Sequence, residues 1–404
     1  MDEIRFSEAV LVIEPQMLAW RRHLHAHPER SFEETETTAF LERELLAIGV
    51  DKIERPTKTG LVARVFGSGA GKPAVVGMRA DIDALPMPEE NSLPYRSTAH
   101  GVMHACGHDG HTAMLLALAK LLVNARASFC GEARLIFQHA EELPPGGAIE
   151  LLRAGAVEGV DAMLGLHLSS NFDTGVFGVK SGMLTAAVDR FDILVRGRGG
   201  HCAFPEQCLD PVVAAAETVL ALQTIVSRRV AADEPAVVSV CEVHAGTAYN
   251  IIPNEARLTA SVRSFGAQTR ALLEREVRRV AEGVARAHGC ESELIWEAGY
   301  PSVVNDEHLT RFASARIEAR FGKAKHLPIG CIMPGEDYAY FLEGRPGFFV
   351  ELGTRNTAKG CDAPHHNPHY RLDEDALRFG LQYEYDMVRA LLDGTRAALE
   401  HGRR

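Results

Sequence analysis

Residues 104–111 read His-Ala-Cys-Gly-His-Asp-Gly-His and lead directly into an apolar run. Three imidazoles, a thiol and a carboxylate within this short segment are not what packing a hydrophobic core requires. The apolar run predicts a helix from Thr112 to Asn124, so the polar segment lies at a helix N-terminus. Cys106 and His108 can point the same way across one glycine, and thiolate and imidazole ligands suit zinc-like ions. The segment therefore predicts a site for a divalent metal.

Two adjacent acids end a later apolar strand. Glu141 and Glu142 stand there, and prolines and glycines at 144–147 then fix the backbone. Adjacent acids at a strand end are often merely solvated, but a stiff turn after them is what positioned carboxylates need. Consecutive side chains diverge, so one can bind a metal while the other acts as a base on metal-bound water. We assign Glu142 as the ligand and Glu141 as the general base.

Further polar groups follow the ends of other predicted strands. Asp81 and Asp83 come after one apolar strand, and His167 ends another. Ligands of parallel α/β sheets bind beyond the carboxyl ends of the strands, so these groups are expected on one rim with the two glutamates. The aspartates could simply cap a turn, or they could hold a metal ligand and the metal charge in place.

A proline-stiffened loop late in the chain carries three more imidazoles. The residues alone leave open which of His365, His366 and His369 binds a metal. Within residues 104–111, His104 and His111 are expected beside the metal ligands or at the start of the helix.

Charge and composition narrow the range of partners. The chain has 43 Lys and Arg against 54 Asp and Glu, a formal net charge of −11. That balance argues against a nucleic-acid or anionic-membrane partner, which needs clustered cations. No apolar run approaches the roughly 20 residues of a membrane span, and no segment resembles a signal peptide. The scattered cysteines suggest reduced thiols, so we expect a cytoplasmic protein.

The order of predicted elements indicates an α/β fold interrupted by an inserted domain. In residues 1–187, strands alternate with helices, which predicts a mostly parallel central sheet with helices on both faces. Ser31 and Glu34 have the spacing of a capping box and predict a helix beginning at Ser31. Residues 188–300 follow the order β-α-β-β-α-β, the ferredoxin-like plan. Residues 301–404 resume the first, metal-binding domain.

Three residues of the inserted domain are candidates for binding a substrate. His201 follows several glycines, and a side chain on such a connection could reach a substrate oxyanion. Arg263 lies on a predicted strand and could clamp a carboxylate with two hydrogen bonds. Asn250 follows a glycine-containing turn and is a similar case.

Taken in order along the chain, these segments resemble the aminoacylase/carboxypeptidase superfamily of metallopeptidases. They are most similar to its hippurate hydrolase and indole-3-acetyl-amino-acid hydrolase branch, over nearly the whole chain. The resemblance rests on the segments 22–29, 79–86, 103–111, 140–142, 199–201, 246–253, 335–337 and 366–368. Each segment is a weak signal by itself, but the ordered set is highly specific. Two positions depart from the usual pattern, because Glu206 replaces a common histidine and His365 replaces an apolar residue.

The resemblance implies a metal-binding catalytic domain and an inserted lid domain that also forms a dimer. Two divalent ions would share the ligands Cys106, His108, Glu142, His167 and His366. Glu141 would be the general base, with Asp83 as a supporting acid. His201 would reach the active site of the partner subunit. Asn250 and Arg263 would bind the carbonyl and carboxylate ends of the substrate.

The predicted reaction is hydrolysis of an N-acyl amino acid, hippurate-like or N-acetylated, to a carboxylic acid and a free amino acid. The ligand mixture is compatible with zinc, manganese or cobalt. A dipeptidase or carboxypeptidase would need the same metals, and a non-catalytic metal-binding protein would keep the ligands without needing a base. We expect a small-molecule substrate and a homodimer or dimer-based oligomer.

Overall fold

The computed structural model describes residues 4–393, which divide into two compact units. The first unit takes the chain up to Leu184, then Val304–Gly330 and the part from Asp337 on. The second unit takes Thr185–Val303 and Cys331–Glu336. The catalytic and lid roles predicted for the two parts of the chain stay predictions.

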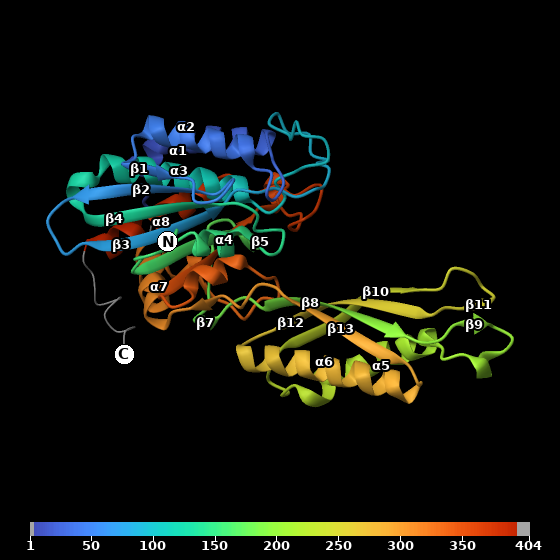
Figure 1. Cartoon of the computed structure of the whole chain (residues 1–404). Coiled ribbons are helices and arrows are strands. Elements are labelled where there is room, and N and C mark those ends of the chain that lie inside the picture. Colours follow the sequence, from blue (N-terminus) through green and yellow to red (C-terminus); the bar gives the residue numbers. More distant parts are fainter. Residues whose placement is uncertain (1–3, 394–404) are drawn as a thin grey trace. The chain divides into compact units, whose positions relative to one another are not determined.

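The first unit is an α/β structure (Figure 1). Its helices are α1 (Glu8–Ala26), α2 (Thr35–Ile48), α3 (His108–Asn124), α4 (Gly147–Arg153), α7 (Glu307–Phe321) and α8 (Asp375–Leu392). Its strands are β1 (Lys52–Glu54), β2 (Leu61–Ser68), β3 (Ala74–Asp81), β4 (Cys130–Gln138), β5 (Ala162–Asp173), β6 (Phe177–Val179), β7 (Gly182–Met183), β14 (Val304–Asn305), β15 (His326–Pro328) and β16 (Gly347–Arg355).

Eight of these strands form one sheet in the order β1-β2-β4-β3-β5-β16-β6-β15. The four central strands, β4, β3, β5 and β16, run parallel to one another. The antiparallel pairs lie toward the two edges, at β1–β2, β2–β4 and β16–β6. The predicted α/β class with a mostly parallel central sheet is confirmed.

Helices cover both faces of this sheet. Phe348 and Val350 of β16 join the core that also contains α1, α3 and α8. Phe349 points to the opposite face, where its ring centroid lies 4.9 Å from that of Tyr338 in the 3-10 segment η4 (Asp337–Leu342). This alternation is what a strand buried on both faces requires. α4 packs beside η4 on that second face.

α3 is buried around almost its whole circumference. From His108 to Leu122 only Lys120 is more than marginally exposed. α3 packs against α1, α2, α8 and the sheet, so every side of it meets apolar neighbours. A helix in such a position shows no amphipathic pattern, which explains the unbroken apolar run. The helix therefore holds its polar first turn firmly in the interior.

The predicted capping box at the start of α2 is wrong. The helix begins at Thr35 rather than at Ser31. The carboxylate of Glu29 accepts hydrogen bonds from two backbone N–H groups in the first turn of the helix, from Glu36 at 3.1 Å and from Thr37 at 2.7 Å. Glu34 makes no capping bond to the helix. A carboxylate from outside the predicted segment replaces the cap, which leaves the Ser31 and Glu34 side chains for other partners.

The second unit contains a four-stranded antiparallel sheet and two long helices (Figure 1). Its elements are β8 (Ala187–Arg196), β9 (Gly200–His201), α5 (Pro211–Arg229), β10 (Ala236–Ala245), β11 (Ile251–Ile252), β12 (Glu255–Ser264), α6 (Ala267–Ala287) and β13 (Glu291–Ala298). The sheet order β10-β12-β8-β13 is that of the predicted β-α-β-β-α-β plan. α5 and α6 pack together over a separate apolar core.

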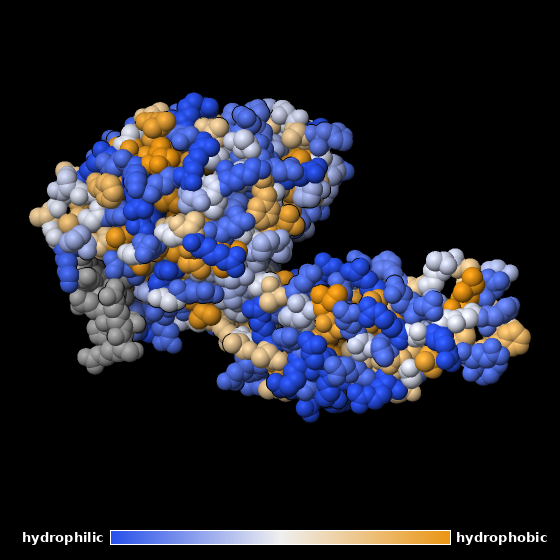
Figure 2. Space-filling view, viewed as in Figure 1, coloured by the Kyte–Doolittle hydropathy of each residue, from blue (hydrophilic) through white to orange (hydrophobic). Residues whose placement is uncertain are grey.

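The surface in view is mainly hydrophilic on both units, with apolar side chains scattered between the charged ones (Figure 2). Among the described helices, none has the length and apolar content needed to cross a membrane.

Candidate metal centre

The ends of neighbouring strands bring the predicted side chains to one edge of the first unit's sheet. Asp81, the last residue of β3, pairs with Gln138, the last residue of β4, so the turns that follow both strands start side by side. β5 runs on to Asp173, so His167 lies within the strand, just past its last pair with β3. The strand was predicted to end at His167, but pairing with β16 extends it.

The polar segment before α3 forms a tight turn into the helix. Gly107 has a φ of 96°, in the left-handed region that favours glycine, and it separates Cys106 from His108. α3 begins at His108 rather than at the predicted Thr112. Its first turn can be polar because carboxylates from other segments hold its side chains, as shown below.

The structure brings all five predicted metal ligands together, and we call them the ligand set. They are Cys106, His108, Glu142, His167 and His366. Cys106 Sγ lies 3.5 Å from His167 Nε2, and Glu142 Oε1 lies 3.1 Å from His366 Nε2. His108 Nε2 lies 3.9 Å from the same Glu142 oxygen. The groups Cys106–His108–His167 and Cys106–Glu142–His366 each have their ligand atoms within 4.8 Å of one another.

Buried polar atoms in the ligand set lack hydrogen bonds. Within residues 4–393, neither His108 Nε2 nor Glu142 Oε1 has a hydrogen-bond partner, although both are buried. The contact of Glu142 with His366 is short but lacks the direction of a hydrogen bond. Buried polar atoms without partners are costly. Atoms that converge in this way fit a metal ion, and the mixed sulfur, nitrogen and oxygen donors fit a zinc-like one.

The pKa values around the ligand set show an excess of negative charge. Burial opposes a charge on His108, but Asp81 and Asp83 outweigh it and raise the pKa of this imidazole to about 10. Burial, with the carboxylates of Glu142 and Glu141, raises the pKa of the Cys106 thiol well above its usual value. A divalent cation would relieve both effects, because it favours the thiolate and the neutral imidazole.

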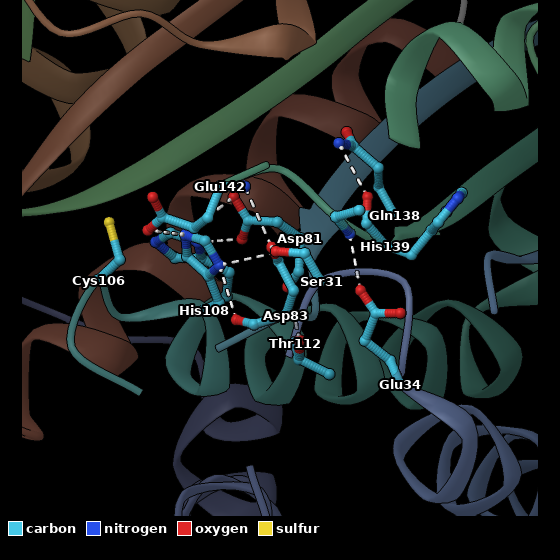
Figure 3. Close-up of polar contacts among 12 residues, drawn as sticks. Ser31, Glu34, Asp81, Asp83, Cys106, His108, Thr112, Gln138, His139 and Glu142 are labelled. Atoms are coloured by element: carbon cyan, nitrogen blue, oxygen red, sulfur yellow. Dashed lines mark hydrogen bonds and ion pairs between the residues drawn. The ribbon is translucent and has the colours of Figure 1, made fainter. Parts of the chain in front are cut away.

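Two aspartates fix the imidazoles of α3, and Figure 3 shows Asp83 beside His108. Nδ1 of His108 lies 3.2 Å from Oδ1 of Asp83 and 3.0 Å from the backbone oxygen of Asp83. These contacts occupy Nδ1, so Nε2 is the nitrogen that can bind a metal. Asp81 accepts a hydrogen bond of 2.6 Å from Nδ1 of His111, whose Nε2 in turn accepts the N–H of Leu168. Carboxylates that orient a metal-binding imidazole in this way are typical of metal sites. His111 thus lies beside the ligand set, and His104 is buried nearby without a hydrogen bond in the described chain.

Glu141 lies at the same centre. The carboxylate oxygens of Glu141 and Glu142 and a ring nitrogen of His108 all lie within 4.8 Å of one another. Glu141 is 8% exposed, so the acid predicted as the base is buried beside the ligand set.

The late loop uses its two adjacent histidines differently. His366 contributes its ring to the ligand set, and its backbone N–H donates to Ala105 O at 2.9 Å. Nε2 of His365 accepts the N–H of Ser170 at 2.9 Å, and burial lowers the pKa of this imidazole to about 3. His369 lies instead 3.1 Å from Glu90. The geometry therefore favours His366 over the other two imidazoles as the ligand.

Sequence reasoning missed two residues that contact this centre. Ser31 donates a hydrogen bond to Asp83, and Glu34 accepts one from the backbone of Ala140, directly before the acid pair (Figure 3). Burial and the charge of Asp83 raise the pKa of Glu34 to about 7. The only sequence signal was the spacing of Ser31 and Glu34, which we interpreted as a helix cap.

The predicted substrate residues lie in the second unit. His201 and Asn250 belong to one small ribbon, where β9 pairs with β11 and Cys202 N–H donates to Asn250 O at 3.3 Å. A hollow of about 700 Å³ beside this ribbon is lined in part by Gly200. Arg263 lies in β12 and donates to Ser261 Oγ at 2.7 Å. The structure does not bring Arg263 into the same ribbon.

Comparison with known proteins identifies the family. The model for peptidase family M20/M25/M40 matches residues 77–390, so the chain belongs to this family. The N-acetylcysteine deacetylase of Bacillus subtilis is 41% identical over 382 residues, which cover 94% of this chain and 97% of that protein. The N-acyl-L-amino acid amidohydrolase of Geobacillus stearothermophilus is 46% identical over 305 residues, covering 76% of this chain and 82% of that protein.

A solved structure agrees over nearly the whole chain. The crystal structure of a dinuclear metal-binding peptidase of the M20 family from Bacillus subtilis is similar with a TM-score of 0.82 and 38% identity. The match covers 95% of this chain and 99% of that one. The predicted superfamily is confirmed, and the protein is a hydrolase of amide bonds.

Proposed function

We propose that this protein hydrolyses N-acyl amino acids, hippurate-like or N-acetylated, to a carboxylic acid and a free amino acid. The observation that carries the proposal is the buried carboxylate of Glu141, which lies beside the ligand atoms of His108 and Glu142. A protein that only bound a metal would need no further acid at this place. The names of the two relatives refer to N-acetylcysteine and N-acyl-L-amino acids, which supports the substrate class.

The ligand set would hold two divalent ions, zinc, manganese or cobalt. The similar peptidase of known structure is described as dinuclear, which supports two metal ions. When bound, the ions would polarise the amide carbonyl and lower the pKa of a water molecule. Cys106 would lose its proton on binding, since the thiolate is the form that binds metals. Asp83 would hold the His108 ring so that Nε2 faces the ions.

Glu141 would move the proton in the reaction. Its carboxylate would take a proton from the attacking water and return one to the leaving amine, acting first as a base and then as an acid. Burial at 8% exposure keeps bulk water from competing for that proton.

The second unit would supply the contacts to the rest of the substrate. Nδ1 of His201 accepts the N–H of Ala203 at 3.1 Å, so a neutral ring carries its proton on Nε2 and can donate it to an oxyanion. Asn250 would bind the carbonyl end of the substrate, and Arg263 would bind the carboxylate end.

We propose that the second unit is also a lid and a dimerisation domain, which places His201 in the active site of the partner subunit. β10 is an edge strand of the four-stranded sheet, and Val243 on it is 57% exposed. On α5, Val213 is 51% exposed and Leu220 is 72% exposed. An unpaired strand edge with exposed apolar side chains supports pairing with a second copy.

The cysteines support a cytoplasmic location, which stays a proposal. All eight of them are free thiols. Free thiols in this number fit a compartment that keeps cysteines reduced.

One assay tests the proposed reaction. Purified protein, analysed for metal, is tested with N-benzoylglycine, N-acetyl amino acids and, in parallel, dipeptides. We expect hydrolysis of the N-acyl amino acids that stops after chelation and returns when metal is added. Faster cleavage of the dipeptides would favour a dipeptidase or carboxypeptidase, and no cleavage by the metal-loaded protein would exclude the proposal.

A further inference from the structure

The turn that carries Glu141 and Glu142 begins with a strained residue. Ala140 has a φ of 48°, in the left-handed region that residues other than glycine rarely adopt. Its side chain is fully buried. A residue stays in such a conformation only where its surroundings fix the backbone, and such residues cluster at functional sites.

Glu34 fixes this conformation from a distant part of the sequence. Its Oε1 accepts a hydrogen bond from the N–H of Ala140 at 2.8 Å and another from the N–H of Phe32 at 3.0 Å. Phe32 also has a positive φ, 67°. The Glu34 side chain is fully buried and points toward the turn (Figure 3). One carboxylate oxygen thus holds two strained backbone segments together.

Ser31 acts on the other side of Glu141. Its Oγ donates to Asp83 Oδ2 at 2.7 Å, and the same oxygen accepts the N–H of Glu142 at 3.0 Å. The N–H groups before and after Glu141 are therefore both held by buried carboxylates. We call Ser31 and Glu34, with these hydrogen bonds, the Ser31–Glu34 clamp.

The far end of the turn is closed as well. Gly147, the first residue of α4, donates its N–H to Ala140 O at 2.9 Å. A Cβ atom at Gly147 would lie 1.9 Å from the backbone oxygen of His139, so only glycine fits there. The carbonyl of Ala140 is therefore held by Gly147, and its N–H is held by Glu34. Removing the Glu34 carboxylate would free the N–H alone.

We propose that the Ser31–Glu34 clamp positions Glu141, by keeping Ala140 in its left-handed conformation so that the carboxylate faces the ligand set. Without the bond to Glu34, Ala140 can relax to a negative φ, which turns the peptide leading into Glu141. Glu34 touches neither substrate nor metal in this account, so it is a positioning residue. The inference rests on the proposed role of Glu141 as the base.

A merely structural role for Glu34 predicts a different result. Loss of a buried hydrogen bond would then lower stability alone, with equal activity for the folded fraction. A positioning role predicts a loss of kcat in folded, metal-loaded protein, because small misplacements of a catalytic group are costly.

The experiment compares Glu34→Leu with Glu34→Gln. The amide oxygen of glutamine can accept both N–H bonds, whereas leucine can accept neither. Glu384→Gln is the matched control, because Glu384 is also a fully buried carboxylate, without a partner for Oε2 in the described chain, and lies on α8. Each variant is measured for kcat, KM, metal content, thermal unfolding and amide hydrogen exchange of the peptide covering 139–143.

We expect Glu34→Leu to lower kcat by about 10²-fold, with KM and metal content nearly unchanged and faster exchange at 139–143. Glu34→Gln should keep kcat within about fivefold of the wild type, since it retains a neutral acceptor. Glu384→Gln should leave kcat and exchange at 139–143 unchanged.

The proposal is overturned if folded, metal-loaded Glu34→Leu keeps the kcat of the wild type, whatever its thermal stability. It is also overturned if Glu34→Gln loses as much kcat as Glu34→Leu. Should Glu34→Leu not fold, Glu34→Met takes its place, because its thioether accepts hydrogen bonds only weakly, and an unchanged kcat in that variant is equally decisive. Failure of the proposed function is a separate result, because the wild type itself would then be inactive on every N-acyl amino acid.

Discussion

Two buried clusters of charged side chains meet at the first turn of α3. One is the ligand set with the acids around it, Asp81, Asp83 and Glu141. The other, which we call the Arg21 cluster, consists of Arg21, His25, Glu89 and Asp109. His108 belongs to the first cluster and its neighbour Asp109 to the second, so a single helical turn serves both.

The Arg21 cluster balances its charges within the chain. Arg21 Nε lies 2.7 Å from Asp109 Oδ2, and His25 Nδ1 lies 2.8 Å from the same oxygen. His25 Nε2 lies 3.2 Å from Glu89. Burial works against these charges, but Arg21 and His25 keep the pKa of Asp109 well below its usual range. Each acid has a cation beside it.

Around the ligand set the balance is different. Arg79 donates to Asp81 at 2.8 Å and to Asp337 at 3.1 Å, so Asp81 is paired with an arginine, as Asp109 is. The pKa values of the His108 imidazole and of the Cys106 thiol are raised there. Asp109, which is paired with an arginine, thus supports the fold. Asp83 and Glu142 have only histidines as ion-pair partners among residues 4–393, so they are suited to an external cation.

The largest expected effect is on catalysis at the ligand set. Glu141→Gln should lower kcat by roughly 10²–10⁴-fold, because the amide cannot accept the proton. Metal content and thermal unfolding should match the wild type, since Glu141 is not in the ligand set. Steady-state kinetics with metal analysis checks this. A variant that hydrolyses N-acyl amino acids at near wild-type rate would remove Glu141 from the mechanism.

The Arg21 cluster should respond in the opposite way, with a loss of stability. Asp109→Asn removes the carboxylate that lies 2.7 Å from Arg21 Nε and leaves the buried Arg21 with the longer contact to Glu374 at 3.3 Å. Breaking a buried pair costs about 3–5 kcal/mol. Urea unfolding measures the change. Arg22→Ala is the control, because Arg22 is 47% exposed where it pairs with Glu374, and such surface pairs contribute about 1 kcal/mol or less. Equal losses in the two variants would break the comparison.

Chelation should lower the stability of the protein through the ligand set alone. At a free metal concentration about 100 times Kd, bound metal adds about 2.7 kcal/mol of stability per site. Thermal unfolding with and without a chelator measures the difference, which Cys106→Ser should reduce. Asp109→Asn should show the same difference as the wild type, and a smaller one would couple the two clusters.

The smallest effect is a pH dependence of the metal-free protein. The pKa of His108 is raised to about 10 in the folded state, so its proton stabilises the fold fully below about pH 6.5. That stability is lost as pH rises toward the folded pKa, by about 1 kcal/mol per pH unit. Urea unfolding of chelated protein between pH 6.5 and 8.5 should show a steeper loss than His108→Gln. Parallel curves for the two proteins would contradict the assignment.

Much of the first unit follows from local sequence patterns. Apolar strands followed by polar residues predicted the edge at which Asp83, Glu142 and His167 meet, because parallel strands end on the same side of a sheet. The ferredoxin-like plan of the second unit followed from the alternation of its strands and helices. The start of α3 was placed too late, since its buried polar first turn looks like a loop when its partners are unknown.

The sequence by itself determined which donor atoms are present and in what order, because metal chemistry restricts the residue types and the apolar periods restrict the elements. The residues alone left His365 and His366 open. Only the tertiary structure showed that the His366 ring lies 3.1 Å from Glu142 and that Glu34 holds Ala140, 106 positions away. The physical reason is that a hydrogen bond between distant segments depends on how the strands pack. The sequence pattern within one segment does not indicate which distant residue that segment will contact.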